Sequence, residues 1–304
     1  MLNSLNKKSN ETAIAVAGRR KRKHSPGYNA WIKFRRNKSA VAGVIMLGII
    51  LVVCVSAPLY LSYENDVLKA DYSLIRQFPA PGHLLGTDEL GRDLLARLLW
   101  GGKTSITISV VSVLVSMVIS LFLGSLAAYY GGTADTLIMR TLDVIMAIPT
   151  TLLMITLVSI MKPSAFNLTL ALGLSFVPGD TRFIRAQVLT VKNNEYIEAS
   201  KGLGGSDFWV ILKHIIPNAI NPLISQFVLY VGTGIVLISS MSFIGLGIQP
   251  PAPEWGTMLS GGREFIRDCW HLTVFPGIAI VLTVTALTLM GDGLRDALDP
   301  RMKR

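Results

Sequence analysis

The feature that most constrains this chain is a series of long apolar runs. An α-helix rises about 1.5 Å per residue, so roughly 20 apolar residues are needed to cross the ~30 Å hydrocarbon core of a membrane. The sequence predicts six spanning helices, at residues 40–61, 104–129, 141–161, 166–186, 219–244 and 272–290.

The composition supports this interpretation. Of the 304 residues, 51% are hydrophobic and only 16% are charged, whereas about a quarter are charged in a typical soluble domain. The formal net charge of +10 is also compatible with nucleic-acid binding. The basic residues lie next to apolar runs, however, which is the pattern of membrane topology. We therefore predict an all-α integral membrane protein that contacts lipid and binds no nucleic acid.

Two of the predicted spans are interrupted. The third carries Asp143 near one end and Pro149 inside it. The fourth is the weakest of the six, because four residues interrupt it: Pro178, Gly179, Asp180 and Arg182. Prolines are tolerated in spanning helices where neighbouring helices bond the freed backbone groups.

The distribution of Lys and Arg predicts the orientation of the spans. Residues 1–39 form a tail with eleven basic residues and a single acid, Glu11, which places the N-terminus in the cytoplasm. Six spans then return the C-terminal tail, 293–304, to the same side, where four more basic residues lie. By the same count, the segment around Glu195 is cytoplasmic.

Two segments on the opposite side are longer than connectors need to be. In 62–103, leucines recur at helical spacing from Asp88 onward, which predicts an amphipathic helix at the membrane surface. The GGKTS at the end of this segment lacks the first glycine of a phosphate-binding loop, because Arg97 stands there. In 245–271, the sequence PPAPEW, which includes Trp255, predicts an irregular loop or a short re-entrant turn at the interface.

The sequence offers little support for other classes of function. Cys54 and Cys269 have no metal-ligand or redox spacing. A membrane-embedded hydrolase needs a nucleophile and a base, and no motif supplies them. Acids near the ends of spans are candidates for a proton relay, so a proton-coupled secondary transporter is the alternative class, with three candidate residues: Asp143, Asp180 and Asp292.

One charged, glycine-bearing segment, EYIEASKGLGGSDFWVILKHIIPN, lies between two apolar runs at 195–218. Asn193 and Asn194 precede it and are suited to cap a short helix that ends at Lys201. Glu195 then lies in the first turn, where a negative charge is favourable. This half of the segment therefore predicts a short, capped helix.

The second half predicts a turn and another short helix. Its three glycines permit backbone conformations that other residues resist: Gly202, Gly204 and Gly205. Ser206 or Asp207 caps the second helix, whose apolar residues share one face: Phe208, Leu212, Ile215 and Ile216. Trp209 and Lys213 flank this face, and Pro217 ends the helix before the fifth span. The pattern fits either a docking surface or a plain interfacial connector.

The segment resembles the EAA loop of ABC-importer permeases: Glu-Ala-Ala, three residues, Gly, nine residues, then apolar, any, apolar and Pro. The matching residues are Glu198, Ala199, Ser200, Gly204, His214, Ile215, Ile216 and Pro217. Ser200 replaces the second Ala, and His214 replaces an apolar residue. The resemblance implies that the segment docks on an ATPase, with Glu198 as a fixed polar anchor and three side chains suited to fill a groove: Phe208, Trp209 and Leu212.

Four other stretches extend the resemblance over 31–304: FRRNKSAVAG, HLLGTDELGRDLLARLLWGGKTS, FIGLGIQPPAPEWGTML and FPGIAIVLTVTALTLMGDGLRDALDPR. They are similar to the C-type permease subunit of the dipeptide/oligopeptide/nickel importer family. The resemblance implies an ABC type I importer permease fold. In that fold, residues 40–61 are the first helix, and residues 104–292 are a five-helix core with the EAA loop at about 193–218.

The resemblance also implies the partners. They are a homologous B-type permease subunit, two cytoplasmic ATPases and an extracytoplasmic substrate-binding protein, in a bacterial cytoplasmic (inner) membrane. The ATPases would bind ATP and Mg, so this chain is expected to hold no cofactor and no metal and to be no enzyme. Di- or oligopeptides are the implied cargo, and nickel chelates, opines and glutathione are the alternatives.

Overall fold

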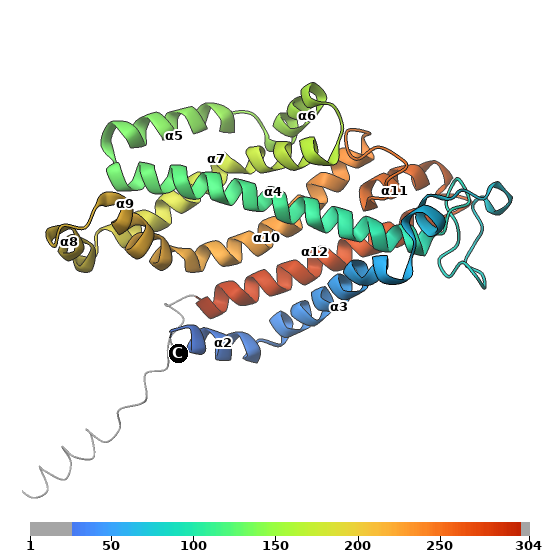
Figure 1. Cartoon of the computed structure of the whole chain (residues 1–304), viewed down its shortest axis with the longest axis horizontal. Coiled ribbons are helices and arrows are strands. Elements are labelled where there is room, and N and C mark those ends of the chain that lie inside the picture. Colours follow the sequence, from blue (N-terminus) through green and yellow to red (C-terminus); the bar gives the residue numbers. More distant parts are fainter. Residues whose placement is uncertain (1–25, 299–304) are drawn as a thin grey trace, which may run out of the picture.

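A computed structural model of the chain describes the structure of residues 26–298. Within that range the chain is helical and forms no β-strand. Four helices are long and apolar enough to cross a membrane: α3 (Lys38–Tyr60), α4 (Leu94–Tyr130), α10 (Ile216–Phe243, continuous from Asp207) and α12 (His271–Leu298). In Figure 1, α3 and α12 run along one side of the bundle, and α4, α7 and α10 form its middle.

The tightest helix pair is α4 with α7 (Ala165–Lys192). Small residues allow the two backbones to approach: a Cβ at Gly173 would lie 2.9 Å from the carbonyl oxygen of Ser112, and one at Gly124 would lie 2.9 Å from that of Thr181. Close approach at small residues is the usual way in which helices associate in membranes. The same face of α4 carries a line of buried serines: Ser105, Ser109, Ser112, Ser116 and Ser120.

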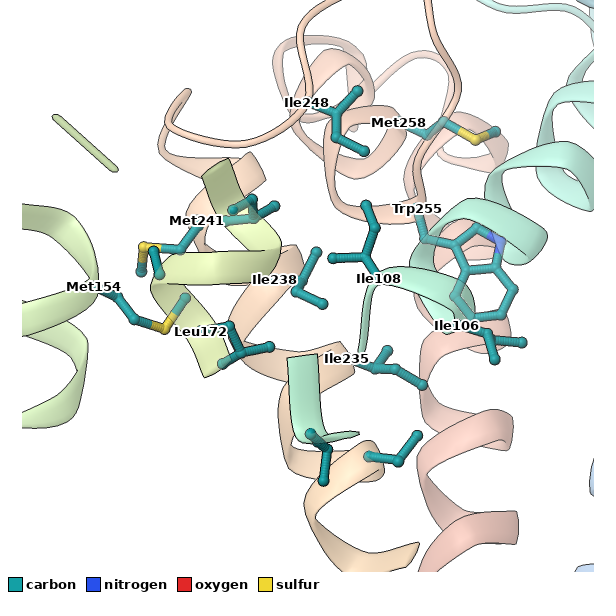
Figure 2. Packing of buried hydrophobic residues seen from close by; sticks show 14 of the residues in the cluster. Ile106, Ile108, Met154, Leu172, Ile235, Ile238, Met241, Ile248, Trp255 and Met258 are labelled. Atoms are coloured by element: carbon teal, nitrogen blue, oxygen red, sulfur yellow. The ribbon is translucent and has the colours of Figure 1, made fainter. Parts of the chain in front are cut away.

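The main apolar core lies where α4, α7, α10 and α11 (Trp255–Gly262) meet. Figure 2 shows Ile108 of α4, Leu172 of α7 and Ile235 of α10 within this core. Trp255 closes this core and is buried, and its indole Nε1 donates to the carbonyl oxygen of Leu98 at 2.8 Å. The predicted irregular loop is present at residues 244–254, whereas Trp255 itself lies inside the fold, where its indole finds a hydrogen-bond partner.

The predicted third span, 141–161, is broken. Helix α5 (Gly132–Met146) and helix α6 (Thr150–Met161) meet at an angle of 84°. Pro149 lies at the break, because proline has no N–H for a continuing helix and disfavours the helical conformation of the residue before it. In Figure 1, α5 and α6 lie on the side of the bundle opposite α3.

The number of spans is four, or five when the bent α5–α6 pair counts as one, by length and composition within residues 26–298. Helix α7 has 28 residues, but the charged residues in its second half keep it outside that count. It continues six residues beyond the predicted end at 186 and contains Pro178 without a break. The predicted six-helix count is therefore not confirmed, although a helix occupies each predicted span.

The predicted amphipathic helix from Asp88 onward is wrong. Residues 62–93 hold only two short turns, η1 (Tyr63–Leu68) and η2 (Tyr72–Leu74), and the leucines from Leu94 belong to the first turns of α4. The Asp93 side chain caps α4 by accepting from the Ala96 N–H at 2.7 Å. The expected boundary at 103/104 consequently falls inside one continuous helix.

The two predicted tails are partly helical. Helix α2 (Pro26–Arg36) lies within the expected N-terminal tail, and α12 runs to Leu298, into the expected C-terminal tail. Residues 1–25 and 299–304 of these tails lie outside the described residues.

Candidate functional site

The predicted short helix in the segment 195–218 is present. Helix α8 (Glu195–Gly202) occupies the expected position. The predicted asparagine cap is wrong, since the Asn194 side chain donates to the carbonyl oxygen of Val191 at 2.8 Å instead of accepting from the helix. The second helix, α9 (Asp207–Val210), is capped as expected by the Ser206 hydroxyl, which accepts from the Trp209 N–H at 3.4 Å.

The glycine turn between α8 and α9 depends on two of the three glycines. Gly204 has φ +86°, in the left-handed region that other residues enter only with strain. The Gly205 N–H donates to the carbonyl oxygen of Ser200 at 3.1 Å, and a Cβ on Gly205 would lie 2.9 Å from that oxygen. The turn therefore folds back tightly on the end of α8 and fixes the angle between the helices.

The second helix does not end at Pro217. After α9 the chain makes a π-helical turn, η3 (Ile211–Ile215), and continues into α10 without a break. Pro217 lies in the first turn of α10, where a missing N–H is tolerated. The prediction of a helix end is therefore wrong. The consequence is that α9 is the rigid extension of a spanning helix.

The apolar residues of this segment do not share one face. Ile215 is buried with Val210 and Ile211, whereas Phe208 is 72% exposed and Leu212 is about half exposed. The π-helical turn changes the angular spacing of side chains, so the predicted α-helical register fails after Val210. The outward side chains form a patch, called here the apolar docking patch, of four residues: Leu203, Phe208, Trp209 and Leu212.

Leu203 was not among the predicted site residues, although it is 90% exposed at the glycine turn. A single leucine between glycines gives no periodic signal, so its exposure follows only from the geometry of the turn. Exposed large apolar side chains are a common feature of surfaces that bind partners.

The helix pair is anchored to the rest of the bundle. Ile197 of α8 is buried in a cluster with Val188 of α7 and Ile215. The Tyr129 hydroxyl, at the end of α4, donates to the carboxylate of Asp207, and the Lys201 ammonium lies 4.3 Å from the Tyr129 ring centre. These contacts join α8 and α9 to α4 and α7. The sequence could not predict them, because Tyr129 and Asp207 are 78 residues apart.

The remaining predicted residues have different surroundings. Glu198 and Ala199 are exposed on α8, and Ser200 is half-buried under the turn. The His214 ring lies 4.7 Å from the Trp209 ring in an edge-on arrangement. The His214 ring therefore packs against Trp209, as an apolar side chain would at this position of the family pattern.

The three acids predicted for a proton relay lie in separate surroundings. Asp143 pairs with Arg182 at the α5–α7 contact, and Asp180 is buried and accepts from the Ser116 hydroxyl at 2.6 Å. Asp292 is exposed on α12. Within residues 26–298, no hydrogen bond joins these three acids to one another.

At the opposite end of the bundle lies a buried charge network. Asp88 accepts from the Arg92 side chain at 2.7 Å and pairs with Arg97 at 3.1 Å. All three are nearly inaccessible to solvent. Arg97 also donates to the backbone carbonyl oxygen of Val67 at 3.0 Å, and Arg92 reaches Glu89 at 3.0 Å. The network holds the irregular segment 62–93 against the start of α4.

Comparison with known families gives two matches. The family described as binding-protein-dependent transport system inner membrane component matches residues 120–304. The family described as N-terminal TM domain of oligopeptide transport permease C matches residues 25–79. The first match includes the whole segment 195–218.

Individual relatives agree with these matches. The chain is 38% identical over 279 residues to the glutathione transport system permease protein GsiD of Pectobacterium atrosepticum, covering 92% of each chain. It is 38% identical over 283 residues to the di/tripeptide transport system permease protein DppC of Pseudomonas aeruginosa, covering 92% of this chain and 93% of the relative. Among solved structures, the inward-facing MetNI methionine ABC transporter shares the fold, with a TM-score of 0.55 and 16% identity over 67% of this chain and 96% of that chain.

Proposed function

The chain belongs to the family of binding-protein-dependent inner-membrane permeases and is the membrane subunit of an ABC importer. We propose that it transports short peptides. Two relatives at 38% identity are named for di/tripeptides and for glutathione, which is itself a tripeptide. A pore that accommodates a peptide backbone would pass both kinds of cargo.

Uptake assays test the cargo. A strain that expresses the complete importer should accumulate a labelled dipeptide, tripeptide or glutathione in an ATP-dependent manner. Uptake of nickel chelates or opines with no uptake of any peptide would contradict the proposed cargo.

We further propose that this chain forms half of the pore, in a heterodimer with a homologous B-type permease. The family implies ATPase and binding-protein partners, and two ATPases would bind ATP and Mg²⁺, leaving this chain without a cofactor. The basic tail supports a topology with both termini in the cytoplasm. Co-purification of one copy of each permease with two ATPase subunits is the expected result.

The apolar docking patch is the proposed contact with an ATPase. The observation that carries this proposal is the exposure of four large apolar side chains on a helix pair that is itself fixed to two spans. Because α9 continues into α10, and Asp207 binds Tyr129 of α4, a displacement of the patch passes directly to two spanning helices. Closure of the ATPases on ATP would then switch the pore between inward-open and outward-open states.

Substitutions in the glycine turn test the coupling. Gly204→Pro, or Glu198→Lys combined with Gly204→Asp, should leave an assembled importer that hydrolyses ATP but no longer moves cargo. Gly202→Ala is the matched control, because a Cβ at Gly202 meets open space and the residue is helical. Wild-type uptake by an assembled Gly204→Pro importer would contradict the coupling role.

A further inference from the structure

A cavity of about 420 Å³ lies at the end of the bundle where α4 begins. Its walls come from three stretches that are far apart in the sequence: residues 88–97 at the start of α4, residues 242–250 at the end of α10 and after it, and residues 257–272, which include η4 (Arg263–Phe265). Three lining residues are exposed, so the cavity opens to the outside of this chain: Gln249, Arg263 and Glu264. The volume is in the range of sites that bind small molecules.

Hydrogen bonds between the walls hold the cavity in place. The Arg97 side chain, from the buried charge network, donates to the carbonyl oxygen of Pro251 at 3.2 Å. The Thr257 hydroxyl of α11 donates to the carbonyl oxygen of Ile248 at 3.0 Å. The loop after α10 is therefore tied both to the start of α4 and to α11, and the cavity is preformed.

A carboxylate with a free oxygen lines the cavity. The Oε1 of Glu89 accepts from Arg92 at 3.0 Å, whereas its other oxygen has no hydrogen bond within residues 26–298. A Cβ on Gly261 would lie 3.6 Å from this carboxylate, which places the group against α11. The Glu89 side chain is 36% exposed. It is therefore accessible from the cavity and suited to accept a hydrogen bond from an ammonium group.

The opposite charge is supplied by Arg263. Its side chain is exposed, and within the described part of the chain it forms no ion pair. The guanidinium carbon lies 5.3 Å from the centre of the Phe243 ring, and one nitrogen lies 3.5 Å from the Phe243 carbonyl oxygen. A guanidinium has five N–H donors, so these contacts leave donors available for a carboxylate.

The rest of the lining combines apolar side chains with one buried hydroxyl. The apolar part consists of four residues: Ile248, Met258, Phe265 and Leu272. Figure 2 shows Ile248 and Met258 at the edge of the main core. Ser242 also lines the cavity, and its buried hydroxyl has no hydrogen-bond partner among residues 26–298. Buried hydroxyls are normally bonded, so a ligand that bonds here satisfies an otherwise unpaired group.

We propose that this cavity binds a short peptide with free termini before the peptide crosses the membrane. The ammonium group donates to Glu89, the carboxylate accepts from Arg263, and an apolar side chain packs against Met258 or Phe265. The lining has equal numbers of acidic and basic residues, which suits a zwitterion better than a simple cation or anion: Asp88, Glu89 and Glu264 with Arg92, Arg97 and Arg263. The inference rests on the proposed cargo and on the proposed orientation, which puts this end outside the cytoplasm.

Peptide binding to the assembled importer, with no binding protein added, tests the proposal. Saturation-transfer NMR measures weak binding of the dipeptide Ala-Phe. N-acetyl-Ala-Phe lacks the ammonium group and should bind the wild type about tenfold more weakly, as expected for the loss of a hydrogen bond to a charged group. Acetylation should make no difference to Glu89→Gln, which has already lost this partner. The C-terminal amide of Ala-Phe should show the same pattern with Arg263→Gln.

The matched controls are Arg267→Gln and Asp268→Asn. Both residues are exposed in the same segment and do not line the cavity, so both variants should bind the three peptides as the wild type does. Equal acetylation penalties in the wild type and Glu89→Gln would overturn the inference. So would absence of Ala-Phe binding in an importer that takes up peptides, and in both cases the proposed cargo stands. An importer that takes up no peptide would overturn the proposed cargo and this inference with it.

Discussion

The two ends of helix α4 differ in which side chains are buried and which are exposed. At its start, Asp88, Arg92 and Arg97 are charged yet buried, and they satisfy one another. At its end, Tyr129 holds a helix pair whose large apolar side chains, such as Phe208, face solvent. The two ends lie at opposite extremes of the bundle in Figure 1, marked by α11 and α8.

The difference shows at which end the side chains find all their partners within this chain. Buried charges that are paired and bonded need no further partner, and such a network is destroyed by loss of a single member. Exposed apolar side chains contribute little to the stability of the fold. Their burial becomes favourable only when a partner covers them. Substitutions at the first end should therefore affect folding, and those at the second end should affect assembly.

The largest effect is expected at the buried network. Asp88→Ala leaves Arg92 and Arg97 buried without their shared carboxylate, which should lower the free energy of unfolding by about 3–5 kcal/mol. Thermal unfolding of the purified chain measures this. Glu64→Ala, at an exposed acid of the same segment, is the control and should melt close to the wild type. A wild-type melting temperature for Asp88→Ala would show that the network does not support the fold.

The second effect should appear only in assembly. Phe208→Ala should weaken ATPase binding by about 2 kcal/mol, roughly thirtyfold, as for a central interface side chain, and change unfolding by less than about 0.5 kcal/mol. A binding titration with the ATPase measures the first quantity. Phe166→Ala is a matched control, since Phe166 is 70% exposed, close to the 72% of Phe208, but lies at the start of α7. Equal loss in both variants would argue against a local docking patch.

A smaller, local effect is expected where the helix pair is anchored. Tyr129→Phe removes the hydrogen bond to Asp207, which is worth about 1.5 kcal/mol for a charged acceptor. Amide exchange should become faster in α8 and α9, while the core of α10 stays protected. Tyr130→Phe, at the exposed neighbouring residue, should leave exchange unchanged. Unaltered exchange in Tyr129→Phe would show that Ile197 and its cluster alone hold the pair.

The smallest effect is expected at the rim of the buried network. Glu89→Gln weakens one contact of Arg92 at a carboxylate that is about one-third exposed. Solvent-exposed ion pairs contribute less than about 1 kcal/mol, so the melting temperature should fall far less than in Asp88→Ala. A loss as large as that of Asp88→Ala would mean that Glu89, too, is structurally essential.

The sequence predicted the segment 195–218 well where local rules apply. The bounds of α8, the Ser206 cap and the glycine turn follow from residue types at short spacing. It failed at Pro217, because the π-helical turn before that proline packs on α7, far away in the sequence. It also missed Leu203, since exposure at a turn has no periodic pattern.

In the fold as a whole, too, the sequence predicted what local rules determine and failed where distant contacts decide. The apolar runs located the long helices, because the thickness of the hydrocarbon region fixes their length. The helical spacing of the leucines after Asp88 predicts a surface helix, whereas from Leu94 onward they belong to the start of α4. Periodicity reports which residues share a face, but not whether that face meets lipid or, as at Trp255, the protein interior.

By itself, the sequence determined that the chain is helical, that it is a membrane protein and that one charged, glycine-bearing segment lies between two apolar runs. These conclusions rest on local chemistry: apolar length, caps and the conformational freedom of glycine. Tertiary structure decided that the charges at one end of α4 are buried and paired, and that the apolar side chains at the other end point outward. Both outcomes depend on contacts between residues far apart in the chain, such as Tyr129 with Asp207, which no local pattern encodes.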